Sequence, residues 1–255
     1  MKIFRFVGIL FIIFLFPKAG MSQSYTPLLD TFNEWHFTTC YSGCLTDVYY
    51  TDGDTVVNGK TYKILDGFHY ISRSFLIRED ISNQKVYLLF DGPNILKSEI
   101  LLYDFSIQAG DTFLMENPIS PFPPNPGNFI CDSIISRPLL DGNNYKHFYF
   151  HPIDTLQAYS QNAIWIEGIG SLSLINAPGG EPDVNDKGSL SCFFKDGIQF
   201  FQNLDSIEVC LPSFFPNSTE LVDAGNKIKL TRRLNSVQIE VDGASFQYQI
   251  FENED

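Results

Sequence analysis

The sequence has few basic residues. It contains 17 lysines and arginines against 30 aspartates and glutamates, which gives a formal net charge of −13 at pH 7. Binding to nucleic acid depends on a basic surface that neutralises phosphates. The charge balance therefore argues against a nucleic-acid partner, and the excess of acidic residues favours solubility.

The apolar run near the N-terminus is too short to cross a membrane. It covers residues 6–16, whereas a membrane-spanning helix needs about 20 apolar residues. Lys2 and Arg5 precede this run and small residues follow it, as in a secretory signal peptide. We expect residues 1–22 to be such a signal, with Gln23 as the first residue of the mature chain and no membrane span after it. No cysteine stands at the cleavage point, which argues against a lipoprotein.

The sequence lacks the common motifs of enzymes and metal sites. It has no Gly-x-Ser-x-Gly turn and no Cys-x-x-Cys pair, and its four histidines are scattered. Residues 180–188 resemble a calcium loop, but Lys187 stands where an oxygen ligand is needed. Glu79, Asp80 and Glu167 are candidates for the two carboxylates of a glycosidase, although an acidic chain offers such pairs by chance. We predict no catalytic residue, no cofactor and no metal ligand.

The chain has five cysteines, an odd number, so at least one cannot pair within the chain, which we expect to be exported. Export permits disulfides. Cys40 and Cys44 are close enough in sequence to close a tight loop. Cys192 is expected opposite Phe201 in a hairpin, so its partner is predicted to be Cys210 on the next apolar segment. The remaining cysteine has no assigned partner.

Short alternating segments separated by turn residues make up most of the chain. Asn58-Gly59 and Asp196-Gly197 each predict a two-residue hairpin turn, because both dipeptides accept positive φ. Long amphipathic helical patterns are almost absent, and the best candidate, residues 154–162, is short. Further strands are expected at residues 33–40, 74–78, 85–90 and 99–105. The spacing is typical of an all-β fold, an antiparallel β-sandwich or meander with short helical turns.

The hairpin at Asp196-Gly197 is rich in phenylalanine. With Lys195 opposite Ile198, the expected pairs are Phe193 with Phe200, Phe194 with Gln199, and Cys192 with Phe201. Aromatic rings then lie on both faces, and we expect this hairpin to lie between two layers.

A neighbouring strand is expected to begin at Trp165. Gly168 and Gly170 within it are typical of a bulge or a close backbone approach.

Polar, turn-rich residues divide the rest of the chain. We expect a β-rich main domain over residues 23–210, a linker over residues 211–226 and a small partial β-hairpin over residues 227–255.

Several segments, in the order in which they occur, resemble exported proteins of Bacteroidota that carry a type IX secretion system type A C-terminal sorting domain. They are DTVVNGKTYK (54–63), RED (78–80), LLYDFS (101–106), GDT (110–112), WIEGIGSL (165–172) and CFFKDG (192–197). Residues 227–251 resemble the early part of such a sorting domain, with TRRLN (231–235) in place of its usual opening motif. The resemblance implies the type IX secretion machinery as a partner. It implies no activity, because that group of proteins is uncharacterised.

These observations together predict a secreted or cell-surface β-rich protein without enzymatic activity, with an adhesion or binding role toward a surface ligand. A periplasmic location is expected if the degenerate C-terminal signal does not work. The alternative is a secreted protein that binds or hydrolyses glycans, since aromatic residues make up 15% of the chain and aromatic rings stack on sugars.

Overall fold

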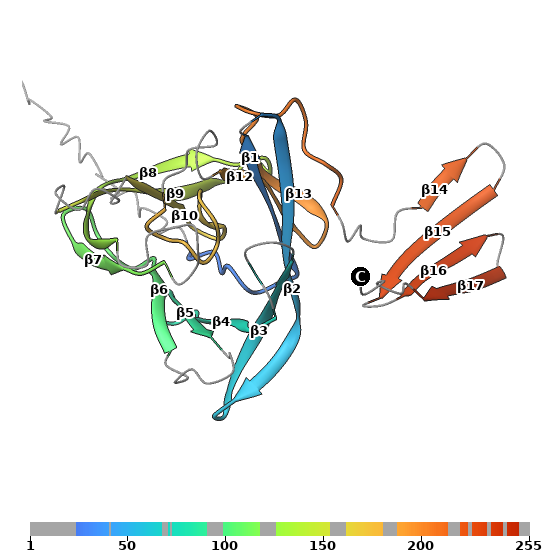
Figure 1. The fold of residues 1–255 in the computed structure, drawn as a ribbon, viewed down its shortest axis with the longest axis horizontal. Helices are drawn as coiled ribbons and strands as arrows, with labels where there is room; N and C mark the ends of the chain where they lie inside the picture. Colours follow the sequence, from blue (N-terminus) through green and yellow to red (C-terminus); the bar gives the residue numbers. More distant parts are fainter. Residues whose placement is uncertain are drawn as a thin grey trace, which may run out of the picture.

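The computed structural model shows an all-β chain built from antiparallel sheets (Figure 1). It describes residues 24–40, 42–67, 71, 73–90, 99–117, 126–153, 162–180, 188–213, 220–223, 226–233, 236–241 and 244–249, with side chains up to residue 213. No helix occurs among these residues. The expected signal peptide, nearly all of the expected helical segment and most of the calcium-like loop lie outside them.

The first sheet has eight strands in the order β13-β12-β1-β2-β3-β4-β5-β6. All of its pairings are antiparallel. Its strands are β1 (Asn33–Cys40), β2 (Cys44–Val57), β3 (Lys60–Gly67), β4 (Phe75–Asp80), β5 (Lys85–Phe90), β6 (Glu99–Asp104), β12 (Ser189–Lys195) and β13 (Ile198–Gln202). Consecutive strands from β1 to β6 are neighbours, so this part of the sheet is the expected meander.

The second sheet has five strands in the order β11-β10-β9-β8-β7 and is also antiparallel. Its strands are β7 (Thr112–Met115), β8 (Gly127–Pro138), β9 (Asn144–Pro152), β10 (Ala163–Ile166) and β11 (Gly170–Ser171). The chain passes from the first sheet to the second between β6 and β7. It returns between β11 and β12, where Leu190 N donates to Leu172 O at 2.7 Å.

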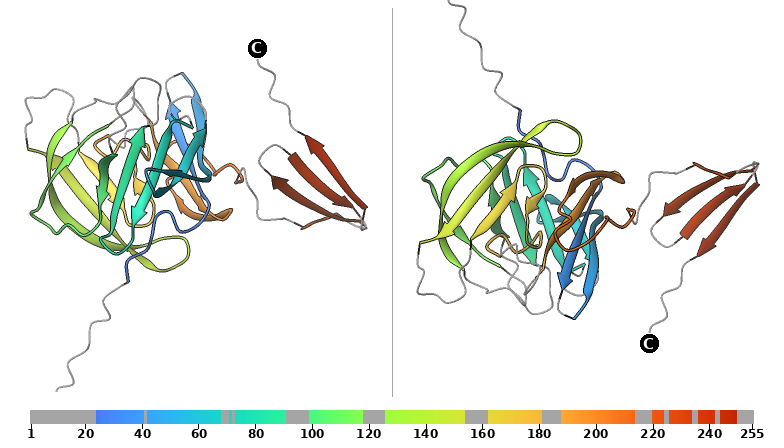
Figure 2. Two further views of the ribbon diagram at one scale, coloured as in Figure 1. Left: turned by 90° about the horizontal axis from the view of Figure 1, so that it is seen from below. Right: turned by 90° about the horizontal axis from the view of Figure 1, so that it is seen from above.

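The two sheets pack face to face as a sandwich-like body around one aromatic core (Figures 1 and 2). Trp165 of β10 lies at its centre, with its ring 4.3 Å from Phe150, 5.0 Å from Tyr103 and 5.1 Å from Phe113, measured between centroids. Tyr103 comes from the first sheet and the other rings from the second. Because large aromatic side chains bury the most apolar area, these contacts hold the two layers together.

The two expected hairpin turns are present. Asn58 and Gly59 have φ of 49° and 76°, and Asp196 and Gly197 have φ of 49° and 78°, as a type I′ turn requires. The first hairpin pairs Asp54 with Lys63, and their side chains form an ion pair at 2.8 Å.

The expected register of the second hairpin is only partly correct. Lys195 pairs with Ile198 and Phe194 with Gln199, but a bulge between Phe193 and Phe194 shifts the pairing by one residue. Phe193 therefore lies opposite Phe201, and Cys192 opposite Gln202. The bulge leaves Phe200 outside the ladder, yet its ring still lies 6.1 Å from that of Phe193.

The strand that begins before Trp165 does not continue through its glycines. Strand β10 ends at Ile166, and Ile169 N donates to Ile166 O at 3.0 Å to close a tight turn. Gly168 and Gly170 adopt φ of 78° and 101°, which side chains with a Cβ rarely accept. The turn matters because it places Glu167 inside the body.

The C-terminal region forms a four-stranded antiparallel sheet instead of a hairpin. Its strands, in spatial order, are β14 (Glu220–Asp223), β15 (Asn226–Arg233), β16 (Ser236–Val241) and β17 (Ala244–Gln249). The expected linker is therefore too long, because its last residues pair with β15: Leu221 lies opposite Ile228 and Val222 opposite Lys227.

Candidate functional site

The residues that precede β1 form a strap between the two sheets. This N-terminal strap, residues 25–30, has no strand partner, so its backbone groups need other hydrogen-bond partners. Leu28 and Leu29 belong to the buried core. On the side of the β12–β13 hairpin, Lys195 Nζ donates to Pro27 O at 2.7 Å.

Glu79 holds the middle of the strap from the first sheet. The carboxylate lies on β4, and its two oxygens accept hydrogen bonds from Leu28 N and Leu29 N, each at 2.8 Å. Oε1 also accepts a bond from the Tyr25 hydroxyl at 2.5 Å. An ionised carboxylate that accepts several N–H and O–H groups makes stronger hydrogen bonds than a neutral acceptor.

Glu167 holds the strap from the second sheet. It lies in the turn after β10, is fully buried, and accepts a hydrogen bond from Thr26 N at 2.9 Å through Oε1. Lys146 Nζ lies 3.4 Å from Oε2 and supplies a positive charge. A buried carboxylate needs such partners because its desolvation is costly.

We call Glu79 and Glu167, with the strap residues that they bind, the clasp. The charges and the burial in this clasp keep Tyr25 protonated, as a hydrogen-bond donor. Burial raises the pKa of Tyr25 far above its ordinary value, and the neighbouring charge of Glu79 raises it further. The phenol therefore stays protonated at every physiological pH. Two of the three carboxylates considered for acid–base chemistry thus converge on the strap, where both accept bonds from it.

Asp80 lies apart from this clasp, although it follows Glu79 directly. Its carboxylate accepts bonds from Asn83 and Ser82 in the exposed turn between β4 and β5. These hydrogen bonds lower the pKa of Asp80 to about 2. Asp80 is therefore a turn residue.

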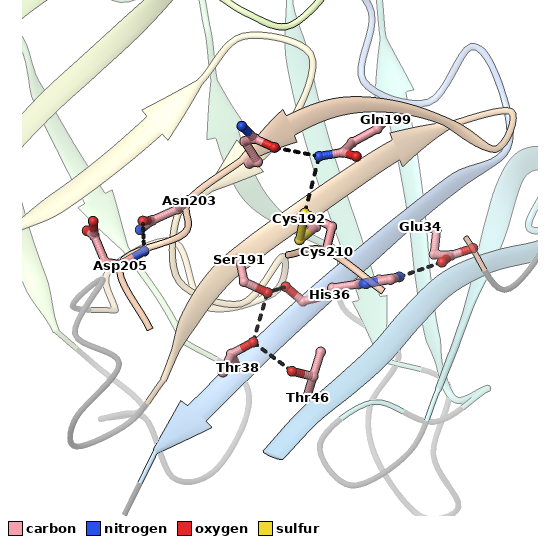
Figure 3. Close-up of a disulfide and its surroundings, with 11 residues drawn as sticks. Glu34, His36, Thr38, Thr46, Ser191, Cys192, Gln199, Asn203, Asp205 and Cys210 are labelled. Carbon is pink, nitrogen blue, oxygen red and sulfur yellow. Dashed lines mark hydrogen bonds and ion pairs between the residues drawn. A yellow bond between two sulfur atoms is a disulfide. The ribbon is translucent and has the colours of Figure 1, made fainter. Parts of the chain in front are cut away.

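A second buried polar group lies on the outer face of β1 (Figure 3). Glu34 and His36 are both fully buried, and His36 Nε2 lies 2.5 Å from Glu34 Oε1. Ser213 Oγ donates to the other oxygen of Glu34 at 2.8 Å. Because Ser213 bonds to the carboxylate and not to the imidazole, the three side chains do not form the relay of a serine nucleophile.

Further polar side chains lie beside Glu34 and His36, on β1 and on the neighbouring strands, and we call the whole set the polar row. Thr38 Oγ1 donates to Ser191 Oγ at 2.8 Å and contacts Thr46 Oγ1 at 2.9 Å, and Ser191 Oγ donates to His36 O at 3.0 Å. Figure 3 shows these side chains beside the Cys192–Cys210 disulfide. Hydrogen bonds within the row satisfy most of its polar atoms, as burial requires.

One disulfide attaches the segment that lies beside this row, which we call the tail (residues 203–213), and a second lies next to it. Cys192 of β12 is bonded to Cys210 of the tail, and Cys40 is bonded to Cys44 at the turn between β1 and β2. These are the two pairs expected from the sequence. The Cys44 sulfur also lies 3.6 Å from Ser206 O, so both disulfides contact the tail.

The remaining histidines lie elsewhere. His147 is buried on β9, where burial lowers its pKa. His151 is exposed and lies 2.5 Å from Asp132. Within the described part of the chain, no three histidine, cysteine or acidic side chains gather in a way that could hold a metal ion.

The sequence predicted the two cysteine pairs, but it indicated Glu79 and Glu167 only as a possible glycosidase pair and gave no sign of the strap. The bonds of the strap join residues far apart, 51 positions for Leu28 with Glu79 and 168 for Pro27 with Lys195, and no local pattern indicates them. The buried row had a signal, because the alternation in NEWHFTTC places Glu34 and His36 on one face.

No membrane-spanning helix occurs among the described residues. Two disulfides are typical of a protein that folds in an oxidising compartment outside the cytoplasm. Comparison with protein-family models, with curated proteins and with solved structures finds no match to this chain.

Proposed function

We propose that this chain is an exported binding or adhesion protein without enzymatic activity, which acts at the cell surface or after secretion. The proposal rests on one observation: the buried carboxylates are hydrogen-bonded to other parts of the chain. Glu79 and Glu167 hold the strap, and Glu34 is bonded to His36 and Ser213. A general acid or base must reach a substrate proton, and these groups are occupied by the chain itself.

The exposed apolar residues support a protein-like ligand more than a glycan. Among the residues up to 213 whose side chains the structure describes, the well-exposed large apolar ones are all aliphatic, and Val209, Ile198 and Val56 are the most exposed of these. Every aromatic side chain that the structure describes in this range is at least partly buried. A sugar-binding strip needs exposed rings, so the described surface favours the interaction role.

Assays of glycan turnover test the proposal. The purified full chain is incubated with a panel of chromogenic glycosides and with polymeric glycans, beside Glu167→Gln. We expect no turnover by either protein. Turnover that the substitution abolishes would establish the glycosidase alternative and overturn the proposal.

The export route is part of the proposal and has its own test. Its support is the N-terminal signal-like segment, the two disulfides, and the resemblance of residues 227–251 to a sorting domain. A reporter fused to residues 211–255 should reach the surface of a Bacteroidota cell and become accessible to added protease. Retention of the fusion in the periplasm would contradict type IX secretion and favour a periplasmic protein.

A further inference from the structure

The two disulfides differ in how far solvent reaches them. Cys44 is exposed and Cys40 is half-buried, at the turn between β1 and β2. Cys192 is fully buried and Cys210 is only 9% exposed. Thiol–disulfide exchange begins when a thiolate reaches one sulfur of the bond. In the folded chain, a thiol from outside therefore has access to the Cys40–Cys44 bond and not to the Cys192–Cys210 bond.

The fold does not depend on the exposed bond. Cys40 and Cys44 are the last pair of the β1–β2 ladder, which continues through the pair of Thr39 with Leu45. Strand pairing therefore keeps the two cysteines opposite each other when the bond is open, and a covalent link across so short a loop adds little stability. The Cys192–Cys210 bond differs, because it ties the tail, which forms no strand, to β12.

From this accessibility and this strand pairing we propose that Cys40–Cys44 is a site of covalent exchange with a thiol of another molecule, and that Cys44 is the sulfur attacked. The incoming thiolate forms a new S–S bond with Cys44 Sγ while the Cys40–Cys44 bond breaks. The electron pair of the broken bond stays on Cys40 Sγ, which takes up a proton from water. One disulfide replaces another, so the step needs no oxidant.

A molecule with two thiols carries the exchange further. Its second thiolate attacks its own sulfur in the mixed disulfide, and Cys44 leaves as a thiolate that takes up a proton. The reagent is then oxidised to an internal disulfide, and two electrons have passed to the protein, which holds both cysteines as thiols.

The charges around the bond determine which thiol the site favours. Cys44 Sγ lies 3.6 Å from Ser206 O, so the tail lies beside the bond. Residues 38–50 and 203–213 contain three acidic residues, Asp47, Asp205 and Glu208, and no basic one. Asp205 and Glu208 are exposed. Because a negative surface attracts cations and repels anions, the site favours a thiol carried by a cationic molecule.

Limited reduction of the full oxidised chain with dithiothreitol, without denaturant, tests the proposal. Free thiols are blocked with N-ethylmaleimide at successive times and located by peptide mapping. We expect Cys40 and Cys44 to be blocked at least roughly tenfold faster than Cys192 and Cys210, because a buried bond reacts only when the chain opens. Equal rates in the folded chain, or faster reaction at Cys192–Cys210, would overturn the proposal.

The same chain unfolded in urea is the control for this measurement. Both bonds are then accessible, so the difference between their rates should disappear. A difference that persists in urea would mean that the local sequence, and not access in the folded chain, governs the exchange, and would also overturn the proposal.

Two small monothiols of opposite charge test which sulfur is attacked and which thiol is favoured. Cysteamine is cationic and 3-mercaptopropionate is anionic, and each rate is divided by the rate of the same thiol with an uncharged small disulfide. At low ionic strength we expect a preference of roughly fivefold for cysteamine, which salt should reduce. Mapping without reduction should place the mixed disulfide on Cys44.

The variants of the two disulfides complete this test. The double variant Cys192→Ser, Cys210→Ser should form the same adduct as the native chain, and Cys40→Ser, Cys44→Ser should form none. An adduct on Cys40 or on Cys192 would contradict the assignment of Cys44, and a preference for the anionic thiol would contradict the role of the acidic residues.

Discussion

The two ends of the sandwich-like body are fastened by different chemistry. The N-terminal strap is held by hydrogen bonds from its backbone to the carboxylates of Glu79 and Glu167. The tail is held by the Cys192–Cys210 disulfide and by the bond from Ser213 to Glu34. The first attachment consists of hydrogen bonds and is insensitive to redox conditions, whereas the second includes a disulfide and depends on an oxidising compartment. The N-terminal attachment belongs to the main core, and the C-terminal one belongs to a smaller buried cluster on the outer face of the first sheet.

Breaking the N-terminal attachment should give the largest effect. Glu79→Ala removes the acceptor of Leu28 N, Leu29 N and the Tyr25 hydroxyl. Bonds to a charged acceptor contribute about 1.5–3 kcal/mol each, so we expect the free energy of unfolding to fall by about 4 kcal/mol, given partial access of water. Urea unfolding at neutral pH measures this loss.

The control for this prediction is the next residue along β4. Asp80→Ala affects only an exposed turn, so its cost should be small, and Glu79→Gln, which keeps one carbonyl oxygen, should fall between the two. An equal loss for Glu79→Ala and Asp80→Ala would contradict the role assigned to the clasp.

Breaking the C-terminal attachment should cost somewhat less. Cys192 and Cys210 are 18 residues apart, and a disulfide that closes a loop of this size stabilises a protein by about 3 kcal/mol in the chain-entropy model. The double variant Cys192→Ser, Cys210→Ser should lose this amount. It should also become sensitive to protease within residues 203–213, because the tail is then held mainly by the Ser213–Glu34 bond.

The other disulfide provides the matched comparison. Cys40 and Cys44 are four positions apart and flank a turn that the β1–β2 pairing already closes. Their replacement by serine should cost less than about 2 kcal/mol, because a shorter loop loses less entropy on closure. A larger loss at this pair than at Cys192–Cys210 would show that chain entropy does not govern these bonds.

The fold was predictable from the sequence where its determinants are local. Asn58-Gly59 and Asp196-Gly197 determine the two turns, and alternation locates β1 and β5 at their observed bounds. The bulge at Phe193/Phe194 was not predictable, because nothing local distinguishes Phe200 from Phe201 as the residue that leaves the ladder.

The candidate site was less predictable because it depends on contacts between distant segments. Glu167 is placed inside by a turn whose glycines suggested a bulge, and Glu79 acquires its role only when the strap crosses β4. The disulfide Cys192–Cys210 was an exception, because the elimination of a hairpin partner left one near segment. The sheet at the C-terminus was underestimated because Leu221 and Val222 form a strand too short to be distinguished from a linker.

The contribution of Glu99 to stability is expected to depend on pH, unlike that of the two disulfides. Glu99 is partly buried, and although burial opposes its ionisation, hydrogen bonds from Arg78, Lys60 and Tyr62 lower its pKa to about 2. A lowered pKa adds stability above the ordinary pKa of glutamate, and this stability is lost as the pH falls from about 4.5 to about 2. After allowance for screening by solvent, we expect Glu99 to contribute about 1 kcal/mol at neutral pH.

The measurement is the difference in unfolding free energy between the native chain and Glu99→Gln at several pH values. The difference should be present at pH 7 and shrink as the pH falls through that window. A difference that stays constant with pH would mean that the charge of Glu99 has no part in its contribution.

Replacement of Cys131 should have the smallest effect, and the reactivity of its thiol tests whether the other four cysteines form disulfides. Its thiol is buried on β8, and burial, with a smaller contribution from the charge of Asp132, raises its pKa to about 11. The thiolate is the reactive form of cysteine, so the folded chain should react with no thiol reagent over hours at pH 7. Unfolding in urea without a reductant should release one reactive thiol per chain, and Cys131→Ala should release none. One reactive thiol in the folded chain would show that the core around β8 opens, and more than one after unfolding would contradict the two disulfides on which the attachment of the tail depends.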